Sequence, residues 1–370
     1  MANTVSIDAL RPEIWQKELY KDREDNLFFA NKQMMGTSEN SLVQVKDQLV
    51  KSKGDQVTFG LTTKLDDSAA ITGDNEAEGN ETAISSYAEA VAIDQVRFPV
   101  RLTGSLDEQK AAYDMRSDAK NKIGIATREF LERQIFMKLG GVTETDLTDV
   151  AGSVYSSQAA WSNTAPIVPA ADEAAGTGNR YVCADAAGID SLEATDILTL
   201  SLITRAKIKA QLASPRMQPI RVDGQDWYVM FIHPWQEYDL KAASTGNNWS
   251  QIQRDAQVRG DRNPIFRGAL GAYDGVILHS HEYVPTCQAS SDFSSGGTDA
   301  AVRCFRALLC GAQAAVMAET KKSMMMVEET FDYKNKVGYA AGFIGGIQKP
   351  AFNSLDYSVI AVDTGATDLS

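Results

Sequence analysis

Residues 105–141 read SLDEQKAAYDMRSDAKNKIGIATREFLERQIFMKLGG, and this stretch predicts a long helix. It begins with a capping box, Ser105-Leu-Asp-Glu108, in which the Ser and Glu side chains each satisfy a free backbone amide. It ends at Gly140-Gly141, because glycine tolerates the left-handed turn that closes a helix. With no proline inside, about 34 residues would form roughly 50 Å of helix. A helix over residues 105–139 is far longer than average, so we expect a rigid structural element.

The predicted helix has one narrow apolar face. Apolar residues recur at helical spacing at Ala112, Met115, Ala119, Ile123, Ala126 and Phe130. On the other faces, Asp118 precedes Lys122 and Glu129 precedes Arg133 by four residues, an order that suits the helix dipole. The pattern indicates a helix that packs along one side.

Composition limits the classes of function. The chain has 370 residues, a hydrophobic share of 44% and a formal net charge of −13. Roughly one to three domains fit this length. The acidic balance disfavours a broad nucleic-acid surface, because phosphate binding needs clustered Lys and Arg. The start, MANTVSIDALRPE, does not predict a signal peptide, and the longest apolar run, residues 307–318, is too short to span a bilayer. The four cysteines show no CxxC spacing, so we expect reduced thiols in a cytoplasmic setting.

The N-terminal 103 residues predict an arm followed by a ribbon. Residues 1–50 hold few apolar side chains, among them Trp15, Leu19 and Phe28, which must dock on this subunit or on another. Alternation over residues 56–62 and 96–103 predicts two strands of a two-stranded ribbon. Pro99 cannot donate to a ladder and predicts an edge position. Such a thin ribbon needs support from outside its own domain.

The segment between these two strands is acidic. Residues 66–82 hold six acidic residues and no basic one. Three interpretations remain open. Residues 74–79 resemble half of a calcium loop, but Ser85 stands where its bidentate Glu belongs. The segment could instead be a solvated loop. The interpretation we favour is an acidic patch, including Asp74, Glu76 and Glu78, that contacts basic residues of a neighbouring subunit. The candidate basic residues lie on the predicted long helix: Arg116, Lys120 and Arg128.

The rest of the chain mixes helices and strands. Residues 143–190 predict an irregular connection, and helices are expected over 197–212, 234–240 and 248–260. Asp223-Gly224 between apolar runs predicts a hairpin. Residues 302–309 predict a buried strand that runs into an alanine-rich helix over 312–318. The last strands are expected near 324–333, 337–348 and 358–362. The order predicts an α+β chain with protruding parts.

The search for chemistry finds no catalytic constellation, cofactor site or metal site. His279-Ser-His281-Glu282 could offer two metal ligands, but no third is marked, and surface histidines are the simpler interpretation. Motifs of nucleophile elbows, zincins and P-loops are absent. The glycines of 268–271 and 342–346 indicate close-packed backbone. Four arginines over residues 254–267 suit either a solvated helix face or a contact with nucleic acid or a neighbouring subunit.

Several motifs together resemble the N-four-type phage major capsid family. They are KGDQVTF (53–59), ITGD (71–74), IDQVR (93–97), the capped helix after them, HP (233–234), NPIFRGALG (263–271), GVILH (275–279), DYKNKVG (332–338) and DYSVI (356–360). The resemblance covers most of residues 53–363. Asp66-Asp67-Ser68 departs from it, because glycine is commoner there in the family.

The resemblance implies a Hong Kong 97-type capsid fold. Its parts would be an N-terminal arm (1–50), an extended E-loop ribbon (51–103), a spine helix and peripheral (P) domain with an irregular connection (104–189), an axial (A) domain (190–325), and return strands of the P-domain with a C-terminal tail (326–370). We infer candidate contacts between subunits from the residues themselves: Trp15, Leu19, Phe28, Asp74, Glu76, Glu78, Arg116, Lys120 and Arg128.

The resemblance also implies a function. It implies a major capsid protein, with no catalysis, whose hexamers and pentamers form an icosahedral shell around the double-stranded DNA of a tailed phage. Portal, scaffolding and decoration proteins would be partners, and assembly would occur in the host cytoplasm without a membrane. Two alternatives remain: an encapsulin-like compartment of the same fold that encloses protein cargo, and an enzyme with an unrecognised site.

Overall fold

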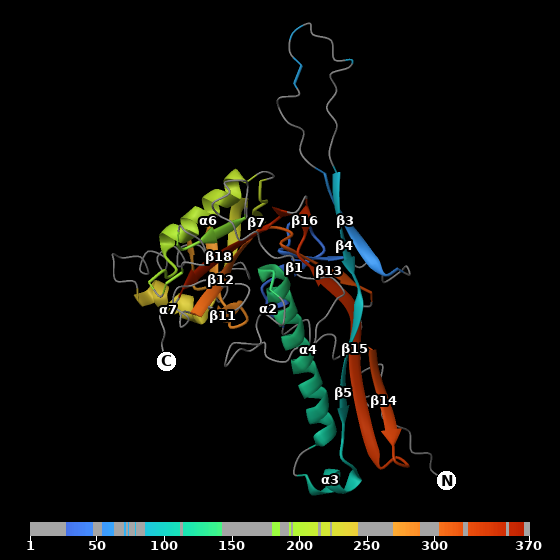
Figure 1. The fold of residues 1–370 in the computed structure, drawn as a ribbon. Coiled ribbons are helices and arrows are strands. Elements are labelled where there is room, and N and C mark those ends of the chain that lie inside the picture. Colours follow the sequence, from blue (N-terminus) through green and yellow to red (C-terminus); the bar gives the residue numbers. More distant parts are fainter. Residues whose placement is uncertain are drawn as a thin grey trace.

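The computed structural model describes residues 27–46, 54–62, 70–71, 73, 78, 86–111, 114–142, 180–185, 192–193, 195–213, 216–222, 224–242, 269–288, 303–320, 325–352 and 355–365. These residues form a body around one sheet, an elongated part in which a second sheet runs beside a long helix, and a projecting two-stranded ribbon (Figure 1). Among the described helices, none has the length and apolar character that crossing a membrane would need.

The body is built on an eight-stranded sheet. Its main order is β6 (Tyr181–Cys183), β18 (Val359–Gly365), β12 (Arg303–Cys310), β8 (Gln225–Ile232), β10 (Val276–Ser280) and β9 (Gly271–Tyr273); β7 (Ile220–Val222) pairs with β8, and β11 (Thr286–Gln288) pairs with β12. Helices α6 (Leu200–Leu212) and α7 (Pro234–Ala242) belong to the body. Buried α6 residues, including Leu202, Ile203 and Ala206, share one apolar cluster with residues of the sheet.

The second sheet is elongated. Its order is β1 (Met35–Gly36), β2 (Val43–Lys46), β13 (Ala315–Glu319), β15 (Lys336–Gln348) and β14 (Met325–Phe331), and β5 (Asp94–Arg101) also pairs with β15. Helix α4 (Met115–Gly140) runs along this sheet and contacts β15 and β5 (Figure 1). The short helix α2 (Phe28–Asn31) precedes β1. A small pair, β16 (Ala351–Phe352) with β17 (Leu355–Asp356), follows β15.

The predicted long helix is two helices. Helix α3 (Ser105–Lys110) ends at Ala111, and α4 begins after Asp114, whose side chain accepts from the Arg116 and Ser117 amides at 3.0 and 3.4 Å. The predicted capping box does not form, because the Ser105 hydroxyl donates to the Asn335 side chain at 2.8 Å instead. The predicted end is confirmed, with Gly141 in the left-handed conformation.

Burial confirms the predicted apolar face at the start of α4. Ala119, Ile123 and Phe130 are buried, whereas Ile125 on another face is 44% exposed. Both predicted ion pairs form, at 2.8 Å for Lys122–Asp118 and 3.0 Å for Arg133–Glu129. From residue 130 to Gly140 all but Arg133 is buried. The last part of α4 is therefore enclosed on all sides rather than packed along one face.

The two strands that pair in the ribbon are not the two that the sequence predicted. Strand β3 (Gln56–Thr62) pairs with β4 (Ser86–Ala92), while residues 94–101 form β5 and pair with β15. Pro99 opposes Ala340, and among the described strands β5 pairs with β15 alone, so its predicted edge position is confirmed. A small apolar cluster joins the base of the ribbon to β13: Val57, Phe59, Val91, Val316 and Ala318.

Other predictions fare unevenly. The hairpin at Asp223-Gly224 forms, with Ile220 opposite Trp227. The expected helix over 312–318 is wrong: residues 315–319 form β13, which is buried between β2 and β15. Strand β18 pairs with β12 and β6 in the body, although the sequence grouped residues 326–370 with the other part. The predicted helix over 248–260 lies outside the described residues.

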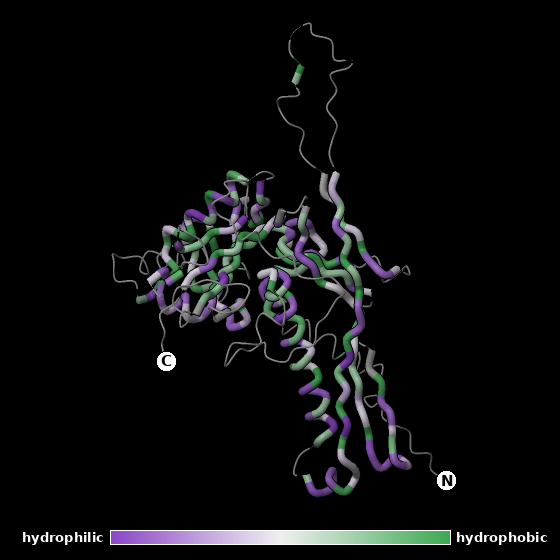
Figure 2. Tube along the Cα trace, viewed as in Figure 1, coloured by the Kyte–Doolittle hydropathy of each residue, from purple (hydrophilic) through white to green (hydrophobic). Residues whose placement is uncertain are grey.

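The glycines of β15 occupy positions where the backbone is close-packed. A Cβ at Gly346 would lie 2.0 Å from the Ala92 carbonyl oxygen, and one at Gly342 would lie 2.6 Å from that of Val96. This confirms the prediction for residues 342–346. Hydrophobic residues gather in the body and at its junction with the second sheet, and hydrophilic residues gather at the end that carries α3 (Figure 2).

Candidate assembly surfaces

The Phe28 side chain docks on its own subunit. Its ring lies edge-on to His281, His279 and Phe231, with centroids 4.8, 5.8 and 6.1 Å apart. Its amide donates to Glu132 Oε1 on α4 at 2.8 Å. Phe28 therefore docks on this subunit, one of the two possibilities that the sequence left open, and its proposed absence of a local core is wrong.

The neighbours of Phe28 extend this docking. Leu27, Phe29 and Met34 are all buried in the main apolar cluster. Residues 27–46 of the predicted arm are therefore part of the folded subunit. Trp15 and Leu19 lie outside the described residues.

Glu132 and His281 form a buried polar group beneath Phe28. Glu132 Oε2 lies 4.0 Å from His281 Nε2, and the His281 ring stacks on Phe136 with centroids 4.7 Å apart. Burial raises the pKa of Glu132, opposed by the hydrogen bond from the Phe28 amide. Burial and the neighbouring His279 lower the pKa of His281 to about 4. The group thus favours a neutral imidazole at pH 7.

The structure corrects the expected surface location of the histidines. His279 is 0% exposed, and the side chain of His281 is 13% exposed. In the part of the chain that the structure describes, no cluster of His, Cys, Asp or Glu could hold a metal ion. Both rings instead pack among aromatic side chains.

The candidate bases of α4 differ in their availability. Arg116 is exposed and forms an ion pair with Glu108 of α3, at 3.2 Å. Lys120 and Arg128 are half-buried. Glu78 is exposed, whereas Asp74 and Glu76 lie outside the described residues. The ribbon and the start of α4 lie at opposite ends of the elongated part, so the structure does not bring the two predicted groups together within one chain (Figure 1).

A buried ionic network joins the end of α4 to the sheet of the body. Arg306 on β12 donates to Asp363 on β18 at 2.7 and 2.6 Å and to the Gly140 carbonyl at 3.1 Å. The Tyr181 hydroxyl on β6 also donates to Asp363, at 2.9 Å. Burial lowers the pKa of Arg306, but the charge and hydrogen bonds of Asp363 more than offset this and raise it. The network therefore links the C-terminal end of α4 to two strands of the body.

A second buried pair closes the chain near β16 and β17. Lys349, with 0% exposure of its side chain, donates to Asp356 at 2.9 Å, and Arg180 donates to the Tyr357 carbonyl. Burial lowers the pKa of Lys349, opposed by Asp356. Sequence reasoning missed both networks. Arg306 and Asp363 stand 57 residues apart, and Lys349 and Asp356, although only 7 residues apart, match no local pattern that predicts a buried pair.

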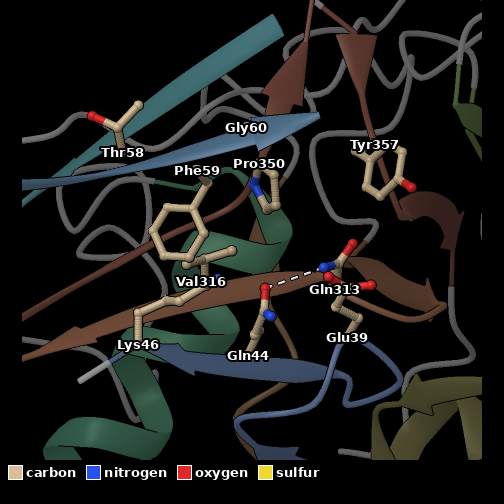
Figure 3. Close-up of a pocket in the computed structure, with 10 residues that line it drawn as sticks. All are labelled: Glu39, Gln44, Lys46, Thr58, Phe59, Gly60, Gln313, Val316, Pro350 and Tyr357. Atoms are coloured by element: carbon tan, nitrogen blue, oxygen red, sulfur yellow. Dashed lines mark hydrogen bonds between the residues drawn. The ribbon is translucent and has the colours of Figure 1, made fainter. Parts of the chain in front are cut away.

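A small open hollow, with a volume of about 90 Å³, lies where the ribbon meets the second sheet (Figure 3). Phe59 of β3 and Val316 of β13 line one side, and Tyr357 and Glu39 line the other. The Lys46 ammonium lies 5.6 Å from the centre of the Phe59 ring. The ribbon thus rests on the sheet through few apolar contacts, with open space beside them.

Comparisons with known proteins identify a family and similar phage capsid proteins. The sequence matches the family model described as phage capsid protein over residues 3–368. The major capsid protein of Pseudomonas phage KPP25 is 25% identical over 364 residues, which cover 95% of this chain and 94% of that protein. The structure of the capsid of Ralstonia phage GP4 has a TM-score of 0.80 at 29% identity, and the match covers 100% of this chain and 95% of that capsid chain.

A more distant structure shows the same fold. The capsid protein of cyanophage Pam1 has a TM-score of 0.69 at 22% identity, with 99% of this chain and 96% of that chain covered. At this identity the likeness concerns the fold alone. The similarity extends over nearly the whole of each chain, so it includes the ribbon, the long helix and both sheets.

Proposed function

The chain belongs to the phage capsid protein family, and from this premise we propose that its copies form the icosahedral shell around the double-stranded DNA of a tailed phage. It is a structural protein of the virion, a major capsid protein. The observation that carries the proposal is the match over residues 3–368 together with the structural likeness to the Ralstonia phage GP4 capsid. Hexamers and pentamers of this one chain would make the shell, and assembly would take place in the host cytoplasm.

The architecture supports a Hong Kong 97-type fold. In this proposal the two-stranded ribbon is the E-loop, α4 is the spine helix, the second sheet forms the P-domain and the eight-stranded sheet forms the A-domain. The pairing of β18 within the eight-stranded sheet favours moving residues 359–365 to the A-domain, and the pairing of β13 favours moving residues 315–319 to the P-domain. The arm would comprise the residues before Leu27.

The thin ribbon supports a role in joining subunits. Few apolar contacts hold its base, and the segment between its strands carries six acidic residues from 66 to 82 and no base. We propose that Asp74, Glu76 and Glu78 meet basic residues of a neighbouring copy. Arg116 is the best placed of the helix candidates because it is exposed, although Glu108 competes for it.

The acidic surface fits the proposed cargo. A net charge of −13 would let a shell enclose DNA without holding it tightly, because retention of phosphate needs clustered bases. Portal, scaffolding and decoration proteins would be further partners, since a shell that fills with DNA needs an entry point. An encapsulin-like compartment is the second candidate of the same fold, but the relatives described above are phage capsids.

The test is expression of the full chain, followed by sedimentation and negative-stain microscopy. Closed particles of uniform size support the proposal, and a monomer at every concentration and salt condition contradicts it. Co-expression with the neighbouring genes separates the two shells: packaged DNA indicates a phage capsid, and packaged protein indicates an encapsulin-like compartment. Turnover of a substrate by the purified monomer would favour the enzyme instead.

A further inference from the structure

Two cysteines stand directly opposite each other in the sheet of the body. Strand β11 carries Cys287, strand β12 carries Cys304, and the antiparallel register of these two strands pairs the residues (Figure 1). Residues 288–303 separate them in the sequence. Cys183 and Cys310 have residues of other types opposite them. Among the paired strands that the structure describes, this is therefore the one place where a cysteine faces a cysteine.

The backbone spacing at this pair suits a disulfide. The Arg306 amide donates to the Pro285 carbonyl at 3.1 Å, so these residues form a hydrogen-bonded pair of the ladder. Hydrogen-bonded and non-hydrogen-bonded pairs alternate along antiparallel strands, which makes Cys287 and Cys304 the next hydrogen-bonded pair. The Cα atoms of such a pair lie about 5.5 Å apart, and disulfides most often join Cα atoms about 5.5–6 Å apart. The two cysteines can therefore be joined with little movement of the backbone.

Strand β11 lies where the body meets the end of α4. It has three residues, and in the part of the sheet that the structure describes it pairs with β12 alone. Pro285, directly before β11, packs against the last turn of α4, because a Cβ at Gly140 would lie 2.7 Å from Pro285 Cγ. This ladder is shorter than the usual strand of about 5–6 residues. A covalent bond to β12 would therefore hold both β11 and Pro285 in place.

We propose that Cys287 and Cys304 form a disulfide within the chain when the protein meets a small-molecule disulfide outside the host cell. The thiolate of one cysteine attacks the small-molecule disulfide, forms a mixed disulfide and releases one small thiol. The thiolate of the other cysteine attacks the mixed disulfide, forms the Cys287–Cys304 bond and releases the second small thiol. The two cysteines together lose two protons and two electrons, which reduce the small-molecule disulfide to its two thiols.

The surroundings of the protein decide which state it adopts. Thiols stay reduced in a cytoplasm, so the expectation of reduced cysteines applies to the subunit as it is made, whereas an oxidising medium favours the disulfide. Only this timing rests on the proposed function, because a virion leaves the cell in which it is built. The choice of the two cysteines rests on the strand register. Because a disulfide restricts the unfolded chain, the oxidised protein should also be the more stable form.

The experiment uses the full chain, purified with a reductant and then incubated under native conditions with excess oxidised or excess reduced glutathione. The remaining thiols are alkylated in denaturant, and the protein is digested with trypsin. Trypsin cuts after Lys and Arg, so it separates Cys287 in peptide 268–303 from Cys304 in peptide 304–306. We expect mass spectrometry to find these two peptides joined in the oxidised sample and separate after reduction. The thermal midpoint should be about 4 °C higher in the oxidised sample than in the reduced one.

Three variants test the pairing. Cys287→Ser and Cys304→Ser should each lose the joined peptides and the rise in thermal midpoint on oxidation. The rise compares oxidised and reduced samples of one variant, so a change in basal stability from altering Cys304, which is 2% exposed, does not affect it. The matched control is Cys310→Ala, which removes another buried thiol from β12. It should keep both the joined peptides and the rise.

Three results overturn the inference. If both cysteines of the parent are recovered as separate thiols after incubation with oxidised glutathione, the opposed residues do not react with each other. If the oxidised sample instead joins two chains, or joins Cys183 or Cys310 to another cysteine, the assigned pairing is wrong. Joined peptides without a rise in thermal midpoint show that the bond does not hold β11 in place. All three are read on the unassembled subunit, so they are distinguishable from a parent that forms no shells, which overturns the proposed function.

Discussion

Arg306 and Asp363 face each other on adjacent strands and share two hydrogen bonds of 2.7 and 2.6 Å in the interior of the body. Side-chain exposure is 4% for Arg306 and 0% for Asp363. Because Arg306 also donates to the Gly140 carbonyl, the pair links the sheet to the end of α4. A pair this buried stabilises little relative to apolar residues, but removing one member leaves the other charge buried without its counter-charge.

We therefore predict that Asp363→Asn destabilises the subunit by about 3–5 kcal/mol. The guanidinium of Arg306 would remain charged and buried beside a neutral amide. Chemical denaturation of the unassembled subunit measures the change. The matched control is Asp274→Asn, which removes the partner of Lys207 from a pair of 2.7 Å at the surface. Asp274→Asn should lower the unfolding free energy by at most about 1 kcal/mol. Equal losses in the two variants would contradict the prediction that burial makes the Arg306–Asp363 pair costly to break.

Helix α4 offers a comparison of two faces. Ala119 is 5% exposed and Ile125 is 44% exposed on the same helix. Ala119→Asp would bury an unpaired carboxylate and should yield insoluble or unfolded protein. Ile125→Asp should fold and cost less than about 1 kcal/mol. Circular dichroism and soluble yield check both, and soluble, assembling Ala119→Asp protein would show that this face is not packed.

Sequence reasoning found this face because burial on a helix follows a local period. The capping box failed for a reason no local pattern contains. Ser105 bonds to Asn335, 230 residues away, Glu108 pairs with Arg116, and the Asp114 side chain caps α4 instead. Each partner was present in the sequence, but the choice among them depends on the folded chain.

The alanine-rich segment 312–318 shows tertiary context overriding propensity. Alanine favours a helix, yet residues 315–319 form a strand with partners on both sides, parallel to β2 and antiparallel to β15. In contrast, the glycines of β15 and the edge position of Pro99 were predicted correctly, because a missing side chain and a missing donor restrict the backbone wherever they occur. The candidate contacts between subunits remain predictions. Residues that contact another subunit do not recur at the regular spacing by which a buried helix or strand face is recognised in a sequence.

Gly346 provides a test of the crossing between β15 and the end of β4, the second strand of the ribbon. A Cβ there would lie 2.0 Å from the Ala92 carbonyl oxygen, a distance that forces the two backbones apart. Gly346→Ala should therefore cost about 1–3 kcal/mol or more in unfolding free energy. Gly60→Ala is the control, because its Cβ would meet nothing closer than 4.0 Å. If the two variants have the same unfolding midpoint, the close approach is not a constraint.

The buried His281 predicts a pH dependence of stability. Its pKa falls from 6.5 in the unfolded chain to about 4 in the fold, so the unfolded state binds the proton first as pH falls. The contribution of His281 to the unfolding free energy is therefore fully present above pH 6.5 and is lost as the pH falls from 6.5 to 4. At 1.36 kcal/mol per unit of pKa shift, the loss is on the order of 3 kcal/mol. His281→Phe keeps a ring against Phe136 and removes this loss.

The measurement is the unfolding free energy of parent and His281→Phe at pH 7 and at pH 4.5. Glu132 works in the opposite direction, because its raised pKa makes the folded state bind its proton first, so its contribution improves as pH falls. The difference between parent and variant removes most of that shared contribution. A difference that stays constant across this range would contradict the prediction.

We predict that the acidic segment of the ribbon stabilises contacts between subunits by electrostatic attraction. Replacing Asp74, Glu76 and Glu78 together by Asn or Gln should weaken the shell at low salt while leaving the folded subunit unchanged. Each surface pair contributes at most about 1 kcal/mol, but a closed shell repeats the contact in every copy. Because salt screens such contacts, we expect parent and variant shells to converge in stability at about 1 M salt.

The control removes three exposed acids elsewhere, Glu193, Asp226 and Glu329, and so changes net charge equally. Dissociation of purified shells is followed by light scattering across salt concentrations. A loss confined to the Asp74, Glu76 and Glu78 variant, greatest at low salt, supports a specific contact with bases of a neighbouring copy. If both triple variants dissociate alike, the charge acts through net repulsion only. If neither differs from the parent at low salt, the segment is a solvated loop.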